Sequence, residues 1–194
     1  MGHYQESHPR YRELQIDEHL RFIEPDLAHA RESLSWVQSA DVIQYMGADF
    51  LNPSLEGEID RLRQIIASGD EYSWMIELDG TIIGNVCINS IAETTRKNSA
   101  QSGNLTVLIG KKVHWGKGIG LNVCRTVLDW AFEGGGFGAM VSRALQENIA
   151  SIKTLQKLGF SETGTEPYEG SPHSPPSLWK NFRIDRDVWQ SRRV

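Results

Sequence analysis

Apolar residues recur along this chain with the two spacings that distinguish strands from helices. Residues 20–23 are a short apolar run, which predicts a strand, and the apolar positions over 25–37 have helical spacing. A second short helical stretch covers 42–46. Ser54 is a suitable N-cap for a further amphipathic helix, which ends before Gly69. The first third of the chain is therefore predicted to be one strand followed by a helical arm.

The middle of the chain has the pattern of an antiparallel hairpin. Residues 74–78 and 81–88 are rich in apolar and β-branched residues and flank an Asp-Gly dipeptide, which favours a two-residue type I′ turn. The polar segment 92–99 predicts a loop, and 105–109 predicts the next strand.

The last third alternates helices and strands. One apolar face over 121–131 predicts a helix that stops at three glycines, and 139–145 predicts a strand. A further helix over 148–158 precedes a last strand at 177–184. The order of elements, a helical arm, an antiparallel meander and then β-α-β-α-β, indicates a mixed α+β fold.

The length of 194 residues is that of one domain, because single domains usually have roughly 100–200 residues. Residues 1–17 are polar and unpatterned, so we expect a polar N-terminal extension and then a single domain over 18–194. No apolar run approaches the roughly 20 residues of a spanning helix, and the start lacks the apolar centre of a signal peptide. A cytoplasmic protein is therefore expected, with Cys87 and Cys124 as free, buried thiols.

The chain carries a net charge of −5, with 39 % hydrophobic and 23 % charged residues. This composition provides one packed core and lacks the basic surface of a nucleic-acid-binding protein. The acidic balance favours a cationic or amine-bearing partner, although the same charge also keeps a domain of this size in solution.

A glycine-rich segment, Trp-Gly-Lys-Gly-Ile-Gly at 115–120, lies between the strand at 105–109 and the helix that follows. The first N–H groups of a helix are free and carry a partial positive charge of about half a unit, so they attract phosphate. Glycines at alternate positions let the backbone turn its amides toward an anion, and Lys117 adds a positive charge. The segment predicts a phosphate-binding turn, with a turn that holds no ligand as the alternative.

Two common phosphate motifs do not fit this segment. In a P-loop, Gly-Lys is followed by the Ser or Thr that holds magnesium, whereas Gly118 follows Lys117 here. The dinucleotide-binding fingerprint needs a third glycine, and residues 121–123 contain none. The P-loop is therefore excluded, and a nicotinamide cofactor is disfavoured.

The segment from Leu108 to Gly120 resembles motif A of the GNAT acetyltransferase superfamily, whose loop has the form Gln/Arg-x-x-Gly-x-Gly/Ala. Trp115 stands where Gln or Arg is usual, as in the ribosomal-protein N-terminal acetyltransferase branch. Asn-Ile-Ala-Ser at 148–151 and Lys-Leu-Gly-Phe at 157–160 resemble motif B of that branch. The resemblance implies a twisted, mostly antiparallel sheet of about six or seven strands flanked by helices. It also implies a splayed strand pair that holds acetyl-CoA.

The resemblance further implies which residues hold the co-substrate acetyl-CoA, with no metal. They come from the strand end, the glycine loop and motif B: Leu108, Ile109, Gly110, Trp115, Gly116, Lys117, Gly118, Ile119, Gly120 and Asn148. Asn148 is also a normal helix N-cap, and both roles can coexist. Backbone N–H groups from Leu108 to Gly110 would polarise the thioester carbonyl if this strand bulges, for which Gly110 is suited.

Acetyl transfer requires a neutral amine, a donor for the developing oxyanion and a departing thiolate. Many family members place a tyrosine in motif B as general acid, but that position is Leu155 here, so Ser151 is the candidate donor to the sulfur. The branch places a Glu after motif B, and Glu169 lies closest to that spacing, with Glu166 nearby. His173 is another candidate base, because the ordinary pKa of a histidine, about 6.5, suits proton transfer at neutral pH.

The acceptor of GNAT enzymes usually lies between the early helices and the last strands, which here places beside it Trp36, Tyr45, Met46 and the loop 165–175. A core position is the alternative for Trp36. Three acceptors remain open: a protein N-terminal amine, a small amine such as a polyamine or aminoglycoside, and an amino sugar or nucleotide-linked amine. A coenzyme-A-binding regulatory module is the alternative function, and an acetylated Cys124 is the alternative mechanism. The oligomeric state is open, with a homodimer as one alternative.

Overall fold

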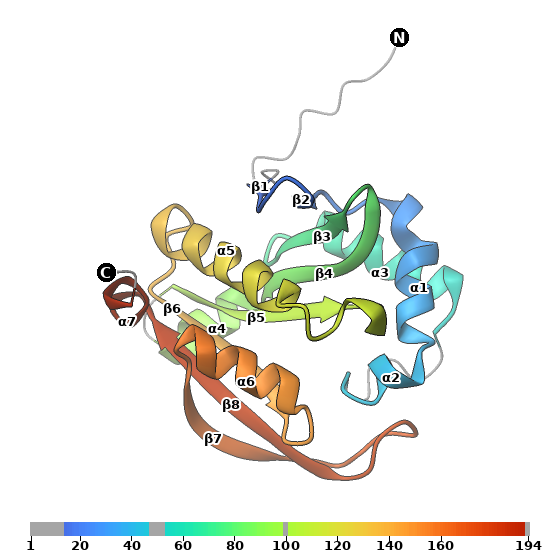
Figure 1. Ribbon diagram of the computed structural model, residues 1–194. Coiled ribbons are helices and arrows are strands. Elements are labelled where there is room, and N and C mark those ends of the chain that lie inside the picture. The colour runs from blue at the N-terminus through green and yellow to red at the C-terminus, as the bar shows by residue number, and fades with distance from the viewer. Residues whose placement is uncertain (1–13, 47–52, 99–100, 193–194) are drawn as a thin grey trace.

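A sheet of eight strands forms the centre of the computed structural model, which describes residues 14–46, 53–98 and 101–192 (Figure 1). The strands are β1 (Leu14–Gln15), β2 (Leu20–Ile23), β3 (Tyr72–Leu78), β4 (Thr81–Asn89), β5 (Ser102–Ile109), β6 (Ala139–Leu145), β7 (Ser161–Tyr168) and β8 (Ser177–Asp185). Their order is β1-β2-β3-β4-β5-β6-β8-β7, and every neighbouring pair is antiparallel except β5 and β6. The expected mixed, mostly antiparallel fold is confirmed, with eight strands in place of six or seven.

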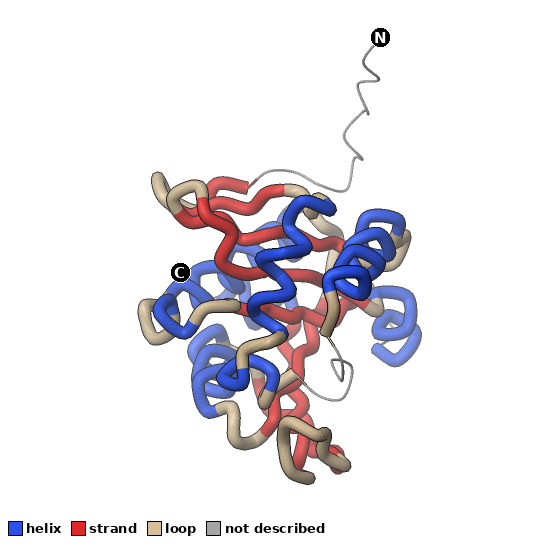
Figure 2. The backbone as a smooth tube through the Cα atoms, turned by 90° about the vertical axis from the view of Figure 1, so that its right-hand side faces the viewer, coloured by secondary structure: helices blue, strands red, loops and turns tan. Residues whose placement is uncertain are grey.

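Helices lie on both sides of the sheet. They are η1 (Leu27–His29), α1 (Ala30–Val37), α2 (Ala40–Ile43), α3 (Leu55–Ala67), α4 (Ile91–Asn98), η3 (Lys112–His114), α5 (Ile119–Glu133), α6 (Ile149–Leu158) and α7 (Arg186–Ser191). In Figure 1, α5 and α6 lie in front of the sheet and α3 lies behind it. The view turned by 90° shows helices on either side of the strands (Figure 2). None of the helices in the described ranges is long and apolar enough to cross a membrane.

The main core lies between the sheet and α5. Side chains alternate between the two faces of a strand, so every second residue of β3, β4 and β6 points to this side, as Trp74, Val86 and Met140 do. They pack with Val127 and Leu128 of α5, and all five side chains are buried. Burial of each large apolar side chain contributes roughly 1.5–3 kcal/mol. This packing fixes α5 against the sheet and therefore fixes the position of its N-terminus.

The sequence pattern does not predict five of these elements, and one of them is the short helix η3, which follows β5. β1 lies within the polar extension, where Leu14 and Ile16 pack against the core. α4 occupies the segment expected to be a loop, and the Thr95 hydroxyl bonds the Ser102 N–H at 3.0 Å. α7 is short and buries Trp189. β7 pairs only with β8 and is exposed at all but its last residue, so it lacks the alternation that predicts a half-buried strand.

β5 and β6 separate part-way along their length. Their parallel pairing covers only Ser102–Asn104 against Ala139–Val141. On their outer sides, β4 remains paired with β5 and β8 with β6 to the ends of both strands. Residues 105–109 of β5 and 142–145 of β6 therefore diverge, and we call these two segments the splay. The splayed strand pair implied by the resemblance is present.

Candidate active site

In the splay, β5 and β6 no longer pair their backbone N–H and C=O groups with each other, as they would in a continuous sheet. At its narrow end the Ser142 hydroxyl donates to the Leu105 carbonyl at 2.9 Å, which bridges the two strands just beyond the last paired residues. After this bridge, every second residue of β5 directs its N–H and C=O toward the diverging side, because successive residues of a strand point their backbone groups in opposite directions. A ligand between the strands can replace the missing partner.

Two backbone N–H groups of β5 face the splay. The Gly110 N–H donates to the Ile83 carbonyl of β4 at 2.8 Å, so Gly110 and, by alternation, Leu108 point away from the splay. Ile109 points toward it, and so does Val107, which is not among the residues that the resemblance implies although period-two alternation marks it. The condition of a bulge at the end of this strand is not met, because the β4–β5 register is continuous and the register shift lies at Ile83, between β3 and β4.

The glycine loop turns back onto the end of β5. The Trp115 indole N–H donates to the Ile109 carbonyl at 2.7 Å, so the residue that replaces the usual Gln or Arg attaches the loop to the strand. Gly116 (φ 71°) and Gly118 (φ 81°) have left-handed backbones, and an added Cβ would meet no described heavy atom within 4 Å at either position. Gly118 is the N-cap of α5 and supplies no side-chain acceptor. The first turn of α5 therefore presents uncapped N–H groups, as anion binding requires.

Positive side chains surround this loop. Lys111 and Lys117 are exposed and have no ion-pair partner within the described ranges. The Lys112 ammonium lies 2.8 Å from the Asp41 carboxylate, which connects the loop to α2, and this hydrogen bond raises the pKa of Lys112. Partial burial, followed by the charges of Lys117 and Lys111, lowers the pKa of His114. A diphosphate at the start of α5 would therefore meet two lysines that no carboxylate neutralises.

Motif B begins directly after β6. The Asn148 side-chain oxygen accepts the Ser151 N–H at 3.2 Å and caps α6, which leaves the Asn148 amide nitrogen without a partner among the described residues. Ser151 is half-buried in the first turn of the helix. Leu155 lies one turn further on and is buried, so the tyrosine position of motif B is a core position here.

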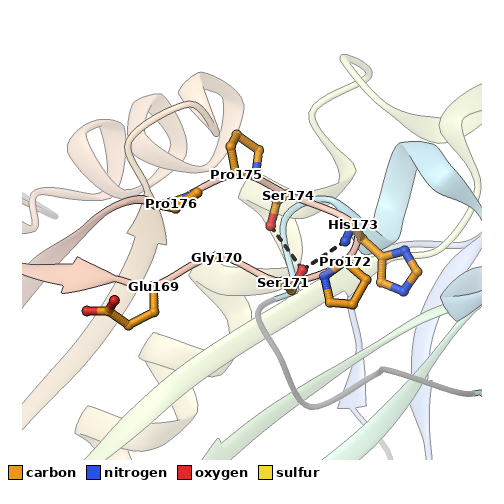
Figure 3. Close-up of a pocket in the computed structure, with 8 residues that line it drawn as sticks. All are labelled: Glu169, Gly170, Ser171, Pro172, His173, Ser174, Pro175 and Pro176. Atoms are coloured by element: carbon orange, nitrogen blue, oxygen red, sulfur yellow. Dashed lines mark hydrogen bonds between the residues drawn. The ribbon is translucent and has the colours of Figure 1, made fainter.

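The loop between β7 and β8 lies beside α1 and α2. A cavity of about 520 Å³ joins these elements and is lined by Val37, Gln38, Ala40, Ile43, Pro53, Ser54 and His173. A second cavity, of about 590 Å³, is lined by residues 169–176 of the loop itself (Figure 3). Glu169 and His173 lie at opposite ends of this loop in Figure 3, so the two candidate bases do not converge. His173 is the one that faces the helical arm.

The residues predicted to contact the acceptor differ in exposure. Trp36 is only 1 % exposed, and an added Cβ at Gly110 would overlap its ring. Trp36 is thus a core residue beneath the end of β5, as the alternative interpretation held. Tyr45 and Met46 follow α2 and are half-buried, so these two, in contrast to Trp36, have surface left to contact a ligand.

Comparison with known proteins decides the family. A model of the acetyltransferase (GNAT) domain matches residues 19–161. The chain belongs to the GNAT acetyltransferase family. The family that motifs A and B indicate is therefore confirmed, and residues 19–161 match an acetyltransferase domain of the GNAT type. An uncharacterised protein of Methanocaldococcus jannaschii is 30 % identical over 101 residues, which are 48 % of this chain and 21 % of that relative. The match thus spans about a fifth of the relative's length.

Solved acetyltransferases share the fold of this GNAT domain. They include the ribosomal L7/L12 α-N-protein acetyltransferase RimL with coenzyme A (TM-score 0.78, 13 % identity, 91 % of this chain and 99 % of that chain). The microcin C7 self-immunity acetyltransferase MccE, with acetyl-CoA and AMP, has a TM-score of 0.74 at 17 % identity, over 89 % of this chain and 95 % of that chain. The Vibrio cholerae spermidine N-acetyltransferase, with CoA and spermine, has a TM-score of 0.76 at 16 % identity, over 90 % of this chain and 99 % of that chain.

The cysteines of this GNAT domain are unsuited to covalent catalysis. Both are free and buried, as expected, and burial raises the pKa of the Cys124 thiol to about 12. A thiol that stays protonated near pH 7 does not attack a thioester efficiently. Mixing the protein with acetyl-CoA alone is therefore expected to leave its intact mass unchanged. A stoichiometric gain of one acetyl group that is lost in Cys124→Ala would contradict this expectation.

Proposed function

We propose that this GNAT protein transfers the acetyl group of acetyl-CoA to a primary amine by direct attack of the amine on the thioester. One observation carries the proposal: Trp115 attaches the glycine loop to the end of β5, so the N-terminus of α5 is held near the wide end of the splay. Coenzyme A is elongated, with a diphosphate in one part and the thioester at its far end, so it can reach from the first turn of α5 into the splay. The similar folds of RimL and MccE, solved with coenzyme A and acetyl-CoA, support the same ligand.

Each part of acetyl-CoA has a suitable partner in this arrangement. The uncapped N–H groups after Gly118, together with Lys117, suit the diphosphate. The N–H groups of Val107 and Ile109 suit the carbonyls of the pantetheine arm and the thioester. The Asn148 amide nitrogen, on the other side of the splay, can donate to the same arm while its oxygen caps α6.

The chemistry then depends mainly on positioning. Holding amine and thioester together replaces an encounter in solution, and a backbone N–H aimed at the carbonyl oxygen stabilises the oxyanion as it forms. Coenzyme A leaves as a thiolate, which is a fair leaving group because the ordinary thiol pKa is about 8.5. The Ser151 hydroxyl, in the first turn of α6, is our candidate donor to the sulfur.

Replacing Ser151 with alanine is expected to lower kcat by about tenfold or more, because a positioned proton donor contributes at least that factor. The KM for acetyl-CoA should change little, since Asn148 still caps the helix. Thr154→Val is the matched control: its hydroxyl lies on the same helix and bonds the Ala150 carbonyl at 2.9 Å. An unchanged kcat in Ser151→Ala, measured by thiol release, would remove Ser151 from the mechanism.

His173 is the better placed of the two candidate bases, because it borders the cavity next to α1 and α2 whereas Glu169 points to the other end of the loop. The described lining of that cavity contains no carboxylate, so it lacks the partners that a polycation needs. We therefore favour an acceptor with a single reactive amine over a polyamine. A pH–rate profile that is unchanged in His173→Ala would exclude this base.

Thiol release from acetyl-CoA across an amine panel tests the proposed function. The panel holds one member of each open class: a short peptide with a free N-terminus, spermidine and glucosamine. We expect release that depends on an amine, with the acetylated amine as its product in equal amount. Tight binding of coenzyme A with no release for any amine would instead support the regulatory-module alternative.

A further inference from the structure

The sheet has an open face next to the splay. β6 and β8 turn alternate side chains toward the core under α5 and α6, and these side chains are buried: Met140, Ala144, Phe182 and Ile184. The intervening residues point to the opposite face, as strand geometry requires. Five side chains of β6 and β8 on this opposite face are not buried: Val141, Arg143, Trp179, Asn181 and Arg183. We call the surface formed by these five residues the open face.

A cation is held in a fixed position on the open face. The Arg143 guanidinium carbon lies 4.5 Å from the centre of the Trp179 ring, within the range of a cation–π interaction. Tyr168 packs edge-on against the same ring, with centroids 5.4 Å apart, and its hydroxyl lies 2.9 Å from the Ser174 Oγ atom. Tyr168 is buried. The Trp179 ring on which Arg143 stacks is therefore fixed by its contact with Tyr168. Because the stacking already restricts the guanidinium, binding a ligand costs less side-chain entropy.

Arg143 lies beside the narrow end of the splay. Val141, paired with Asn104, is the last residue of β6 in register with β5, and Arg143 is the next residue of β6 on the same face. Thr106 is its counterpart on β5 and is exposed. Since α5 and α6 cover the other face, an acceptor can reach a thioester in the splay from the open face, where it meets the guanidinium.

No carboxylate in the described part of the chain neutralises the charge of Arg143. Among the described residues it has no ion-pair partner. Arg183 on the same face lies 2.6 Å from the Asp185 carboxylate. Glu166 of β7 is paired in register with Trp179, on the far side of that ring, and makes no ion pair with Arg143. Arg143 is exposed, so its guanidinium, stacked on Trp179 and without a described carboxylate, is accessible to an external oxyanion.

We propose that Arg143, stacked on Trp179, binds a phosphate or carboxylate group of the acceptor. The acceptor is then a small amine that carries a negative charge away from its reactive nitrogen, such as a phosphorylated or nucleotide-linked amino sugar. This inference rests on the proposed function, because it assumes that an amine enters the splay from the open face. Arg143 is a specificity-determining residue, and Trp179 positions it.

Acetylation of three matched amines tests the inference: glucosamine, glucosamine 6-phosphate and glucosaminuronate, whose sixth carbon carries a hydroxyl, carries a phosphate or is a carboxylate. We expect at least one anionic amine to exceed glucosamine in kcat/KM, and Arg143→Gln to reduce that preference by about tenfold or more, mainly through KM. Trp179→Leu should reduce it less. Arg125→Gln removes another exposed arginine, on α5, and should leave the preference unchanged.

Calorimetric binding of the same amines to the complex with coenzyme A separates this inference from the proposed function. Tighter binding of an anionic amine that Arg143→Gln weakens would support the inference even without turnover. Turnover of all three amines with a preference that Arg143→Gln leaves unchanged would overturn the inference and retain the transferase. If the wild-type complex bound glucosamine as tightly as both anionic amines, or more tightly, the inference would also be overturned.

Discussion

Replacing Gly118 with valine is expected to lower kcat/KM for acetyl-CoA by about a hundredfold. Gly118 has a φ of 81°, which a β-branched residue adopts only with strain, so the backbone before α5 must rearrange. The N–H groups of the first turn then no longer converge on one point. Each charge-assisted hydrogen bond to a phosphate contributes about 1.5–3 kcal/mol, so the loss of two is enough for this effect. Steady-state kinetics and the calorimetric affinity for coenzyme A measure it.

Gly80→Val is the matched control for this experiment. Gly80 has a φ of 76° and equally open surroundings, but it lies in the turn between β3 and β4. The two variants should lose similar stability, because the backbone strain is alike. Only the Gly118 variant should lose affinity for coenzyme A. If both variants kept wild-type affinity, or lost it equally, the glycine loop would not be the diphosphate site.

Replacing Gly110 with alanine is expected to destabilise the protein by about 3 kcal/mol, the upper range for overpacking a core. The added methyl group would overlap the ring of Trp36, which is fully buried and cannot move aside. Because the Gly110 N–H also bonds the Ile83 carbonyl, the strand end cannot shift without losing a hydrogen bond. Denaturant unfolding measures the loss, and the thermal midpoint should fall by roughly 8 °C.

The double variant Gly110→Ala with Trp36→Leu identifies the cause of this loss. A smaller side chain at position 36 leaves room for the methyl group, so the double variant should be more stable than the sum of the single effects by about 1 kcal/mol or more. Additive effects would show that the strain at Gly110 does not come from Trp36. Since this contact attaches α1 to the end of β5, the same cycle also reports how the helical arm is held beside the splay.

Local signals in the sequence predict several features of the structure, both in the candidate site and away from it. The Asp-Gly turn, the helix cap at Asn148 and the glycine loop each depend on a few adjacent residues, so a single sequence contains them. The left-handed backbones of Gly116 and Gly118 fit the expectation of an amide-lined turn. The sequence shows that Trp115 departs from the motif. Its hydrogen bond to Ile109 depends on tertiary geometry, which the spacing of residues along the chain does not predict.

Features that depend on distant partners were not predictable. β7 is exposed almost throughout and is a strand only because it pairs with β8, and α4 is held by a bond between Thr95 and Ser102. The contact of Arg143 with Trp179 joins two strands that are not consecutive in the chain. The role of Gly110 also depends on a distant partner: a glycine is needed there for the close approach to Trp36, and the strand has no bulge against β4.

A crystal structure of the protein with coenzyme A tests the central claim most directly. We predict the diphosphate at the N–H groups that follow Gly118 and the pantetheine arm between β5 and β6. Its carbonyls should lie within hydrogen-bond distance of the Val107 or Ile109 N–H, with the thiol near Ser151. Coenzyme A bound elsewhere, with the splay empty and the first turn of α5 free of phosphate, would contradict the account.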